Sequence, residues 1–225
     1  MRWRRSTAVA VAICVFVTLF FAQHVSADFY FIYNGHTYQF IQENRAWLSA
    51  TSAAKARSVA GSPGYLAQID SAAENQEIFT RLLAGVPSSQ FNNTRAPDGG
   101  SGAYVWIGAT DRVTEGGWIW DGDGDGAGPQ FWQGNNTGAP VGGLYNNWGK
   151  TGGVQNEPDN FNNLQDAAGI SLDGWPLGVA GQWNDVNESN TLYYLAEFNA
   201  VPEPSVLTCA LLLPALRRYC RPSPT

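Results

Sequence analysis

The first half of the chain shows two hydrophobic periods, one typical of strands and one typical of helices. Residues 29–40 alternate loosely between aromatic and polar side chains, which predicts one or two strands. Residues 43–57 place apolar and small side chains at helical spacing, notably from Trp47 to Ala54, and predict a helix. Residues 65–69 form a short apolar run and predict a further strand.

A second helix is predicted to begin at Ser71. Ser71 and Glu74 form the S-x-x-E pattern of a capping box, in which each residue satisfies a free backbone N–H at the helix start. Apolar residues between Ile78 and Leu83 give this helix a buried face, and Gly85 is its expected end. Residues 86–103 are polar and predict a loop.

The periodic pattern weakens after residue 120. Residues 104–110 and 117–120 predict two strands joined by a turn, whereas 121–181 are rich in Gly, Asn and Asp. Such a long aperiodic stretch inside a compact domain is usually functional or disordered. Embedded aromatic residues argue against disorder, because they need a place to pack: Phe131, Trp132, Trp148, Phe161 and Trp175. Residues 182–183 and 192–198 predict the closing strands.

Both ends of the chain predict export. Residues 1–27 combine arginines, an apolar run and Val25-Ser26-Ala27 in the layout of a secretory signal peptide. Residues 201–225 contain Pro202-Glu203-Pro204, a short apolar run and terminal arginines, and resemble the sorting tail of bacterial PEP-CTERM proteins. That resemblance implies a cell-surface or extracellular-matrix location, with only transient membrane contact through the tail. The folded domain is expected at residues 28–200.

Charge and cysteine content narrow the functions of this domain. Residues 28–200 hold seven basic and 18 acidic residues, a net charge of −11, which makes nucleic acid an improbable partner. All three cysteines lie outside it, so thiolate metal sites and cysteine nucleophiles are excluded there. His36 is its one histidine and is expected to be structural.

Oxygen-bearing side chains are concentrated in residues 153–166 and in the later Trp183-Asn184-Asp185. Carboxylate and amide oxygens are the ligands that Ca²⁺ prefers, and neither zinc nor copper suits such a set. Pro158 separates Glu157 from Asp159, and a cis bond there could turn both carboxylates to one side. The sequence therefore predicts a calcium site.

The segments resemble, in order, the C-type lectin-like domain family. The matching segments are the 47–54 helix, 64–78, Trp106-Ile107-Gly108, the 111–116 turn, Trp118, Trp120, Glu157-Pro158-Asp159, Trp183-Asn184-Asp185 and Ala196-Glu197-Phe198. The resemblance covers residues 29–199. It implies an α+β fold with two helices, two small antiparallel sheets and a long Gly/Asn/Asp-rich loop region that carries calcium and ligand.

The resemblance also implies two sets of calcium ligands. The principal, ligand-binding set falls on Glu157, Asp159, Gln165, Asn184 and Asp185. A second set falls on Asp111, Glu115, Asn160 and Asp166, with Gln165 as a shared candidate. The turn residues Asp111 and Glu115 could equally be solvated without a metal.

The motif departs from the sugar codes of the family. Mannose-type members have Glu-Pro-Asn and galactose-type members have Gln-Pro-Asp, whereas this chain has Glu157-Pro158-Asp159 and Gln165 in place of a usual Glu. Glu157 and Asp159 only accept hydrogen bonds, while Gln165 and Asn184 can also donate. Neither sugar code can be carried over.

The acidic loop and the tryptophans are weaker evidence for a binding site. The acidic glycine-rich loop 121–126 is similar to an EF-hand loop, but its twelfth position is Trp132 rather than the required Glu, so a weak calcium site is the most it predicts. Trp106, Trp118, Trp120 and Trp183 are expected in the core. Trp132, Trp148 or Trp175 could stack on a sugar, although packing is the favoured role.

Three functions compete. The leading prediction is an exported, non-catalytic, calcium-dependent carbohydrate-binding module that recognises a surface glycan or exopolysaccharide. The alternative is a structural or adhesive module that binds protein, with calcium serving only the loops. A glycosidase that uses Glu157 and a second acid is disfavoured, since carboxylates around a calcium ion are poorly suited to carrying a proton.

Overall fold

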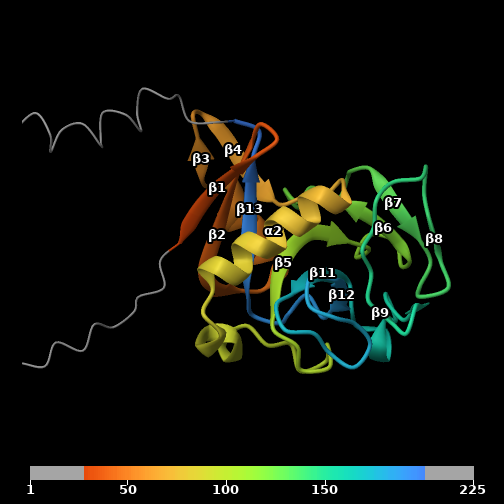
Figure 1. Ribbon diagram of the computed structural model, residues 1–225. Coiled ribbons are helices and arrows are strands. Elements are labelled where there is room, and N and C mark those ends of the chain that lie inside the picture. Colours follow the sequence, from red (N-terminus) through yellow and green to blue (C-terminus); the bar gives the residue numbers. More distant parts are fainter. Residues whose placement is uncertain (1–27, 201–225) are drawn as a thin grey trace, which may run out of the picture.

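The computed structural model describes residues 28–200 as one mixed α/β unit (Figure 1). The predicted signal peptide and sorting tail lie outside the described residues. Its first half forms β1 (Phe29–Tyr33), β2 (His36–Arg45), α1 (Trp47–Lys55), β3 (Ser58–Val59), β4 (Ser62–Leu66) and α2 (Ala72–Gly85). After a 3-10 turn at Ser88–Asn93 come β5 (Tyr104–Thr110), β6 (Gly117–Trp120), β7 (Gln130–Gln133) and β8 (Ala139–Pro140). The rest forms β9 (Lys150–Thr151), β10 (Val154–Gln155), a 3-10 turn at Phe161–Asn163, β11 (Ala167–Ser171), β12 (Trp183–Val186) and β13 (Leu192–Phe198).

The closing strand β13 organises the sheet. It pairs antiparallel with β2 and β4 and parallel with β5, so the last segment of the domain lies between its first segments. β1 and β2 form a hairpin around Asn34-Gly35, and both turn residues have positive φ, as the Asn-Gly turn type requires. The strand order continues from β5 through β6 and β7 to β8.

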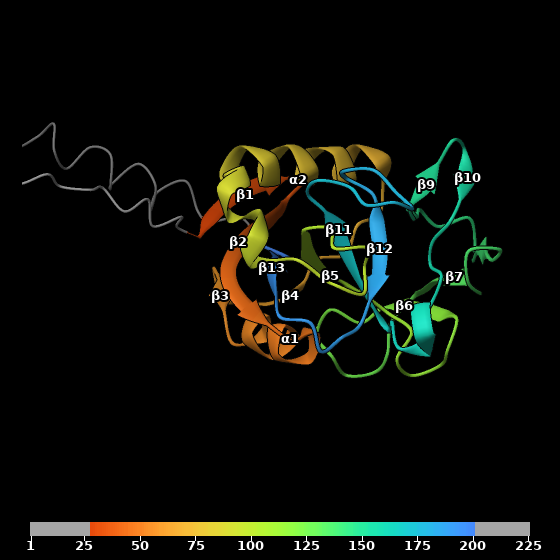
Figure 2. The same ribbon diagram turned by 90° about the horizontal axis from the view of Figure 1, so that it is seen from below.

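The two helices cover opposite faces of this sheet (Figure 2). Along β5 the side chains alternate: Val105 and Ile107 belong to the core cluster of α2, whereas Tyr104 and Trp106 belong to that of α1. The α1 face is tied to the sheet by the indole of Trp47, which donates to the Ile107 carbonyl at 2.9 Å. Burying apolar side chains on both faces explains why β5 is buried along its whole length.

The second helix begins as the capping pattern predicts. The Ser71 hydroxyl accepts the Glu74 N–H at 3.2 Å, and the Glu74 carboxylate accepts the Asp70 N–H at 2.7 Å. Gly85 still belongs to α2, and a Cβ on it would lie 2.1 Å from the Phe29 ring. Gly85 therefore allows α2 to approach β1 closely, in addition to ending the helix.

Two sequence expectations were wrong in detail. The first helix starts at Trp47 instead of Glu43, because residues 43–45 extend β2 and pair with β13. The expected two small sheets form one eleven-stranded network plus the β9–β10 hairpin, and the β13–β5 pair is parallel. The long Gly-rich region 121–181 contains β7 to β11, and its aromatic residues Phe131, Trp132, Trp148 and Trp175 are buried, as their need to pack predicted.

The ends of the described chain and the irregular loops lie on different sides. Figure 1 places β1, β2 and the end of β13 on the left and β6 to β9 on the right, with β11 and β12 below the middle. The Thr37 hydroxyl donates to the Ala200 carbonyl at 2.6 Å, which fixes the end of the described segment against β2. Within residues 28–200, no helix is long and apolar enough to span a membrane.

Candidate functional site

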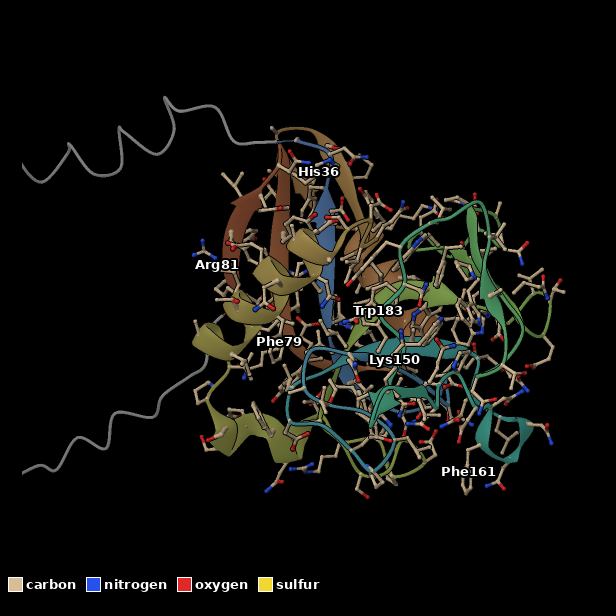
Figure 3. All side chains as sticks on the ribbon, turned by 45° about the vertical axis from the view of Figure 1, so that its right-hand side comes forward. His36, Phe79, Arg81, Lys150, Phe161 and Trp183 are labelled. Atoms are coloured by element: carbon tan, nitrogen blue, oxygen red, sulfur yellow. The ribbon has the colours of Figure 1, made fainter. Side chains whose placement is uncertain are left out.

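Strand β12 carries two of the predicted ligands and is anchored by α2. The Trp183 indole donates to the side chain of Asn75 at 2.7 Å, and β12 pairs with β11 along its length. Trp183 is fully buried among other aromatic rings, which include Trp120 and Trp148 (Figure 3). This packing fixes the backbone from which Asn184 and Asp185 extend.

The Glu157-Pro158-Asp159 motif lies directly against β12. The Glu157–Pro158 peptide bond is cis. The Asp185 carboxylate accepts the backbone N–H groups of Asp159 at 3.1 Å and Asn160 at 2.7 Å. Oxygens of Glu157, Asp159 and Asp185 all lie within 4.8 Å of one another. Two segments far apart in sequence therefore bring three carboxylates together.

Two buried oxygens at this cluster have no hydrogen-bond partner. They are Glu157 Oε2 and Asn184 Oδ1, on side chains that are 1% and 2% exposed. The other oxygen of Glu157 accepts the Trp175 indole N–H at 2.8 Å. Buried polar atoms are nearly always satisfied, so an orphaned carboxylate oxygen and an orphaned amide oxygen at one place call for an explanation.

Burial raises the pKa values of the clustered carboxyls. The pKa of Glu157 rises to about 9, mainly through burial and next through the charge of Asp185. The pKa of Asp185 rises to about 7 by burial, although the backbone N–H of Asn160 opposes the rise. The ionised cluster thus lacks a compensating positive charge, which a divalent cation would supply. The orphaned oxygens and the all-oxygen donor set fit Ca²⁺.

Gln165 lies beside the carboxylate cluster, but both polar atoms of its side chain already form hydrogen bonds within the protein. Its Oε1 accepts the Phe161 N–H at 2.6 Å, and its Nε2 donates to the carbonyl and carboxylate of Asp98, both at 3.2 Å. Gln165 lines the same pocket as Glu157, Asp159 and Asn184. The structure therefore brings the five principal candidates together, and their role as ligands stays a prediction.

The second predicted set is also gathered in one region. The Asn160 amide donates to Glu115 at 2.6 Å, and the Asp111 N–H donates to the Asp166 carbonyl at 3.2 Å. Asp111 Oδ1 is buried without a partner, and burial raises the Asp111 pKa to about 8, with Glu115 and Asp166 adding to the rise. Metal binding by this set is likewise still a prediction.

The pocket contains residues that sequence reasoning missed. Its volume is about 250 Å³, and its wall includes Asp98, Gly99, Gly100, Pro176 and Leu177, together with Trp175, which the sequence analysis had named as a candidate for stacking. Asp98 also accepts the Asn187 N–H at 2.7 Å, which links the 97–100 loop to the end of β12. Nothing in the local sequence singles out Asp98, because its partners are 67 to 92 residues away.

Most of the tryptophans discussed above are buried in the core, and Trp175 is the one that reaches the pocket. Trp106, Trp118, Trp120 and Trp183 are in the core as predicted, and Trp132 and Trp148 are also buried, so neither can stack on a ligand. Trp175 is 9% exposed and reaches the pocket, where it hydrogen-bonds Glu157. Figure 3 shows Phe161 at the edge of the molecule beside this region.

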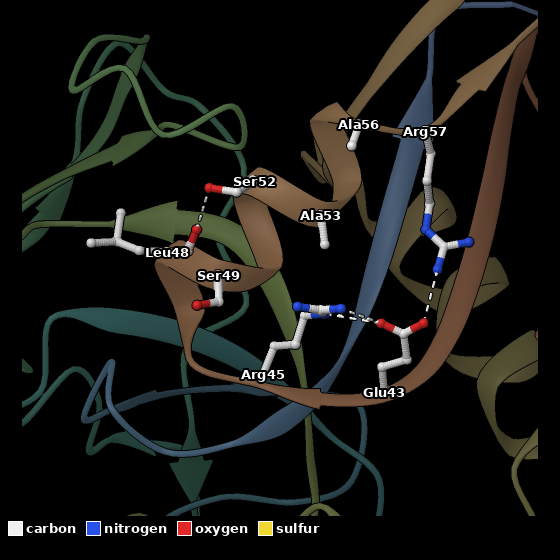
Figure 4. A pocket seen from close by; sticks show the side chains of 8 residues that line it. All are labelled: Glu43, Arg45, Leu48, Ser49, Ser52, Ala53, Ala56 and Arg57. Carbon is white, nitrogen blue, oxygen red and sulfur yellow. Dashed lines mark hydrogen bonds and ion pairs between the residues drawn. The ribbon is translucent and has the colours of Figure 1, made fainter.

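The other pocket and side-chain clusters described here are weaker candidates for a binding site. A larger hollow of about 740 Å³ lies between β2 and α1 (Figure 4), but its charged side chains pair with one another, Glu43 with Arg45 at 2.8 Å and with Arg57 at 3.4 Å. The carboxylates of Asp121, Asp123 and Asp125 also cluster, yet both oxygens of Asp121 accept the Gly126 N–H. His36 contacts Glu197 at 2.6 Å, which fits a structural role.

The chain is similar to one curated protein in sequence and to several solved structures in fold. No protein-family model matches the chain. Halomucin of Haloquadratum walsbyi is 34% identical over 117 residues, which span 52% of this chain and 1% of that protein. The chain thus corresponds to a very small part of this curated relative.

Solved structures similar to this one are C-type lectin domains. C-type lectin CEL-I from Cucumaria echinata is 23% identical, with 75% of this chain and 93% of that chain covered and a TM-score of 0.48. The carbohydrate-recognition domain of the mouse scavenger receptor C-type lectin is 24% identical, with 78% and 97% covered and a TM-score of 0.48. That of cow CD23, solved in the presence of a GlcNAc2Man3 oligosaccharide, is 18% identical, with 76% and 94% covered and a TM-score of 0.48. Because each of these TM-scores is below 0.5, we take the function from the residues of this chain.

Proposed function

We propose that this chain is an exported, non-catalytic, calcium-dependent carbohydrate-binding module with a C-type lectin-like fold. The observation that carries the proposal is the pair of orphaned buried oxygens, Glu157 Oε2 and Asn184 Oδ1, at a three-carboxylate cluster. Buried carboxylates without a cation are costly, and Ca²⁺ binds such oxygens readily.

The principal ion would be held by Glu157, Asp159, Asn184 and Asp185, with Gln165 beside them. A bound Ca²⁺ supplies positive charge and open coordination positions that sugar hydroxyls can occupy. Asp185 also holds the backbone of Asp159 and Asn160, so it keeps the motif loop in place. Asp111, Glu115, Asn160 and Asp166 would hold a second ion and stiffen the same loop.

The proposed use of all three carboxylates as calcium ligands supports a non-catalytic role. A glycosidase requires one carboxyl that is free to carry a proton and a second at a set distance. Here all three carboxylates would be ligands, and each would be charge-compensated by the same ion. The pocket wall offers Asp98 as a further acid, but its carboxylate is held by Asn187, Asn190 and Gln165.

Export and display are part of the proposal and rest on residues 1–27 and 201–225. The position of the site is compatible with display, since the described chain begins and ends on the β1–β2–β13 side (Figure 1). The pocket is lined by residues 97–100 and by residues between 157 and 184. We place the protein at the cell surface or in the extracellular matrix.

Retention on immobilised sugars tests the proposal. The protein should bind a set of neutral and amino-sugar columns in the presence of Ca²⁺ and elute with a chelator. Glu77→Gln on α2 is a suitable control, because it removes one acidic charge on a remote helix. Absence of any calcium-dependent retention contradicts carbohydrate binding.

A protein-binding adhesive module is the second candidate. Exposed apolar side chains beside the pocket favour it, since Phe161 and Leu164 are 52% and 56% exposed. Large exposed apolar residues next to a polar site are common at protein interfaces. A calcium-stabilised protein that no sugar column retains would support this candidate over the first.

A further inference from the structure

All but one of the side-chain N–H donors of the pocket are already in use, the exception being the second N–H of Asn184. Gln165 Nε2 donates to Asp98, the Trp175 indole donates to Glu157, and Asn184 Nδ2 donates to the Tyr104 hydroxyl at 2.9 Å. From the sequence, the amides of Gln165 and Asn184 are groups that can donate as well as accept. In the structure each of these nitrogens has an acceptor within the protein.

The side chains of the pocket therefore present mainly acceptors to a ligand. Glu157 Oε2 and Asn184 Oδ1 are unpartnered, and Asp159 is the most exposed of the three clustered carboxylates. None of the described residues that line the pocket carries a positive charge. One divalent cation against Glu157, Asp159 and Asp185 leaves a net charge of −1, and Asp98 adds another.

A sugar hydroxyl suits such a pocket only in part. A hydroxyl on Ca²⁺ gives its proton to a carboxylate, but for its remaining lone pair these side chains offer a single free amide donor, the second N–H of Asn184. An ammonium group has three donors and no acceptor, so it needs nothing that the pocket lacks. Hydrogen bonds between charged partners are also roughly twice as strong as neutral ones.

We propose that the ligand is an amino sugar with a free, protonated amine, which contacts Asp159 beside the calcium site. This inference rests on the proposed function and specifies its substrate class.

The remaining wall suits the rest of such a ligand. The pocket lining also contains apolar side chains, those of Pro97, Trp175, Pro176, Leu177 and Phe161. A volume of 250 Å³ equals roughly eight water molecules, which is enough for one sugar ring. The C–H groups of the ring can lie against these apolar side chains while the amine and hydroxyls face the acids.

Calorimetric titration with matched sugars tests the inference. The probes are methyl glycosides of glucosamine and galactosamine, each with its N-acetyl and its 2-hydroxyl counterpart, at saturating Ca²⁺ and pH 6. We expect the free amine to bind at least tenfold more tightly than both counterparts. The preference should shrink at pH 9, where less of the amine is protonated. Equal affinity across each matched set overturns the inference.

Asp159→Asn is the decisive variant, and Glu77→Gln is its matched control. Asp159→Asn should reduce the amine-to-hydroxyl affinity ratio at least tenfold, whereas Glu77→Gln should leave it unchanged. An unchanged ratio in Asp159→Asn contradicts the inference. A calcium-induced rise in melting temperature, measured on every variant, confirms that the site still forms.

The two proposals can fail separately. Calcium-dependent binding of neutral sugars as tight as that of amines refutes the amine preference and leaves the calcium lectin standing. Amine binding without any calcium response refutes the calcium lectin alone. Absence of both refutes both.

Discussion

At the residue scale, some residues of the site could be predicted from the sequence and others could be found only in the structure. The acids and amides around Pro158 and after Trp183 could be found from sequence, because oxygen ligands cluster locally there. Asp98 and Tyr104 could not, since each acts through a hydrogen bond to a residue far along the chain. Trp175 was predicted as a candidate for stacking, but its hydrogen bond to Glu157 was not. These long-range contacts also decide which N–H donors of the pocket stay free for a ligand. Because most of these donors are engaged, the pocket favours an amine over a neutral hydroxyl.

Without calcium, stability should fall as pH rises. The pKa values of Glu157 and Asp185 in the folded protein, about 9 and about 7, exceed those of the unfolded chain, so the folded state binds more protons in this range. The stabilising contribution is complete below about pH 4 and is lost as pH rises toward 9. Melts in chelator at pH 5, 7 and 9 should show decreasing midpoints. Midpoints that rise steadily to pH 9 would contradict the assignment.

Glu157→Gln should separate stability from calcium binding. Gln keeps an acceptor for the Trp175 indole but removes a buried carboxyl, so at pH 8 without calcium the unfolding free energy should rise by about 1–3 kcal/mol. The calcium-induced stabilisation should largely disappear. Denaturant unfolding with and without Ca²⁺ measures both effects, and a variant with a full calcium response would show that Glu157 is no ligand.

At the element scale, local signals placed most helices and strands, and long-range pairing set their limits. The capping pattern fixed the start of α2. The first helix was predicted four residues too early because Glu43 and Arg45 are good helix formers, and pairing with β13 overrides that preference. The Asn34-Gly35 turn that divides β1 from β2 is a strong hairpin signal that resolves the ambiguity of one or two strands.

Gly85→Ala should destabilise the contact between α2 and β1. In an open helix this change usually stabilises, by about 1 kcal/mol. Here the new methyl group would meet the Phe29 ring, and overpacking typically costs about 1–3 kcal/mol. Thermal unfolding should show a lower midpoint, equally large with and without Ca²⁺ because Gly85 is not part of the pocket. An unchanged or higher midpoint would mean that Phe29 moves aside freely.

At the scale of the whole molecule, the aromatic cluster explains how a Gly-rich region becomes a site. Trp118, Trp120, Phe131, Trp148 and Trp183 pack ring against ring, with centroids 4.6 to 6.1 Å apart. They hold the loops in place without disulfides. The acidic excess of the domain then favours cations at its surface.

The central claim is that residues of the Glu157-Pro158-Asp159 loop and β12 bind Ca²⁺. The most direct measurement is a thermal melt of the protein across a Ca²⁺ titration, with Mg²⁺ as the control ion. Binding to the folded state should raise the midpoint with Ca²⁺, in the range of about 0.1–1 mM typical of extracellular modules, and much less with Mg²⁺. An unchanged midpoint up to about 10 mM Ca²⁺ would contradict the claim, because such a concentration exceeds that range.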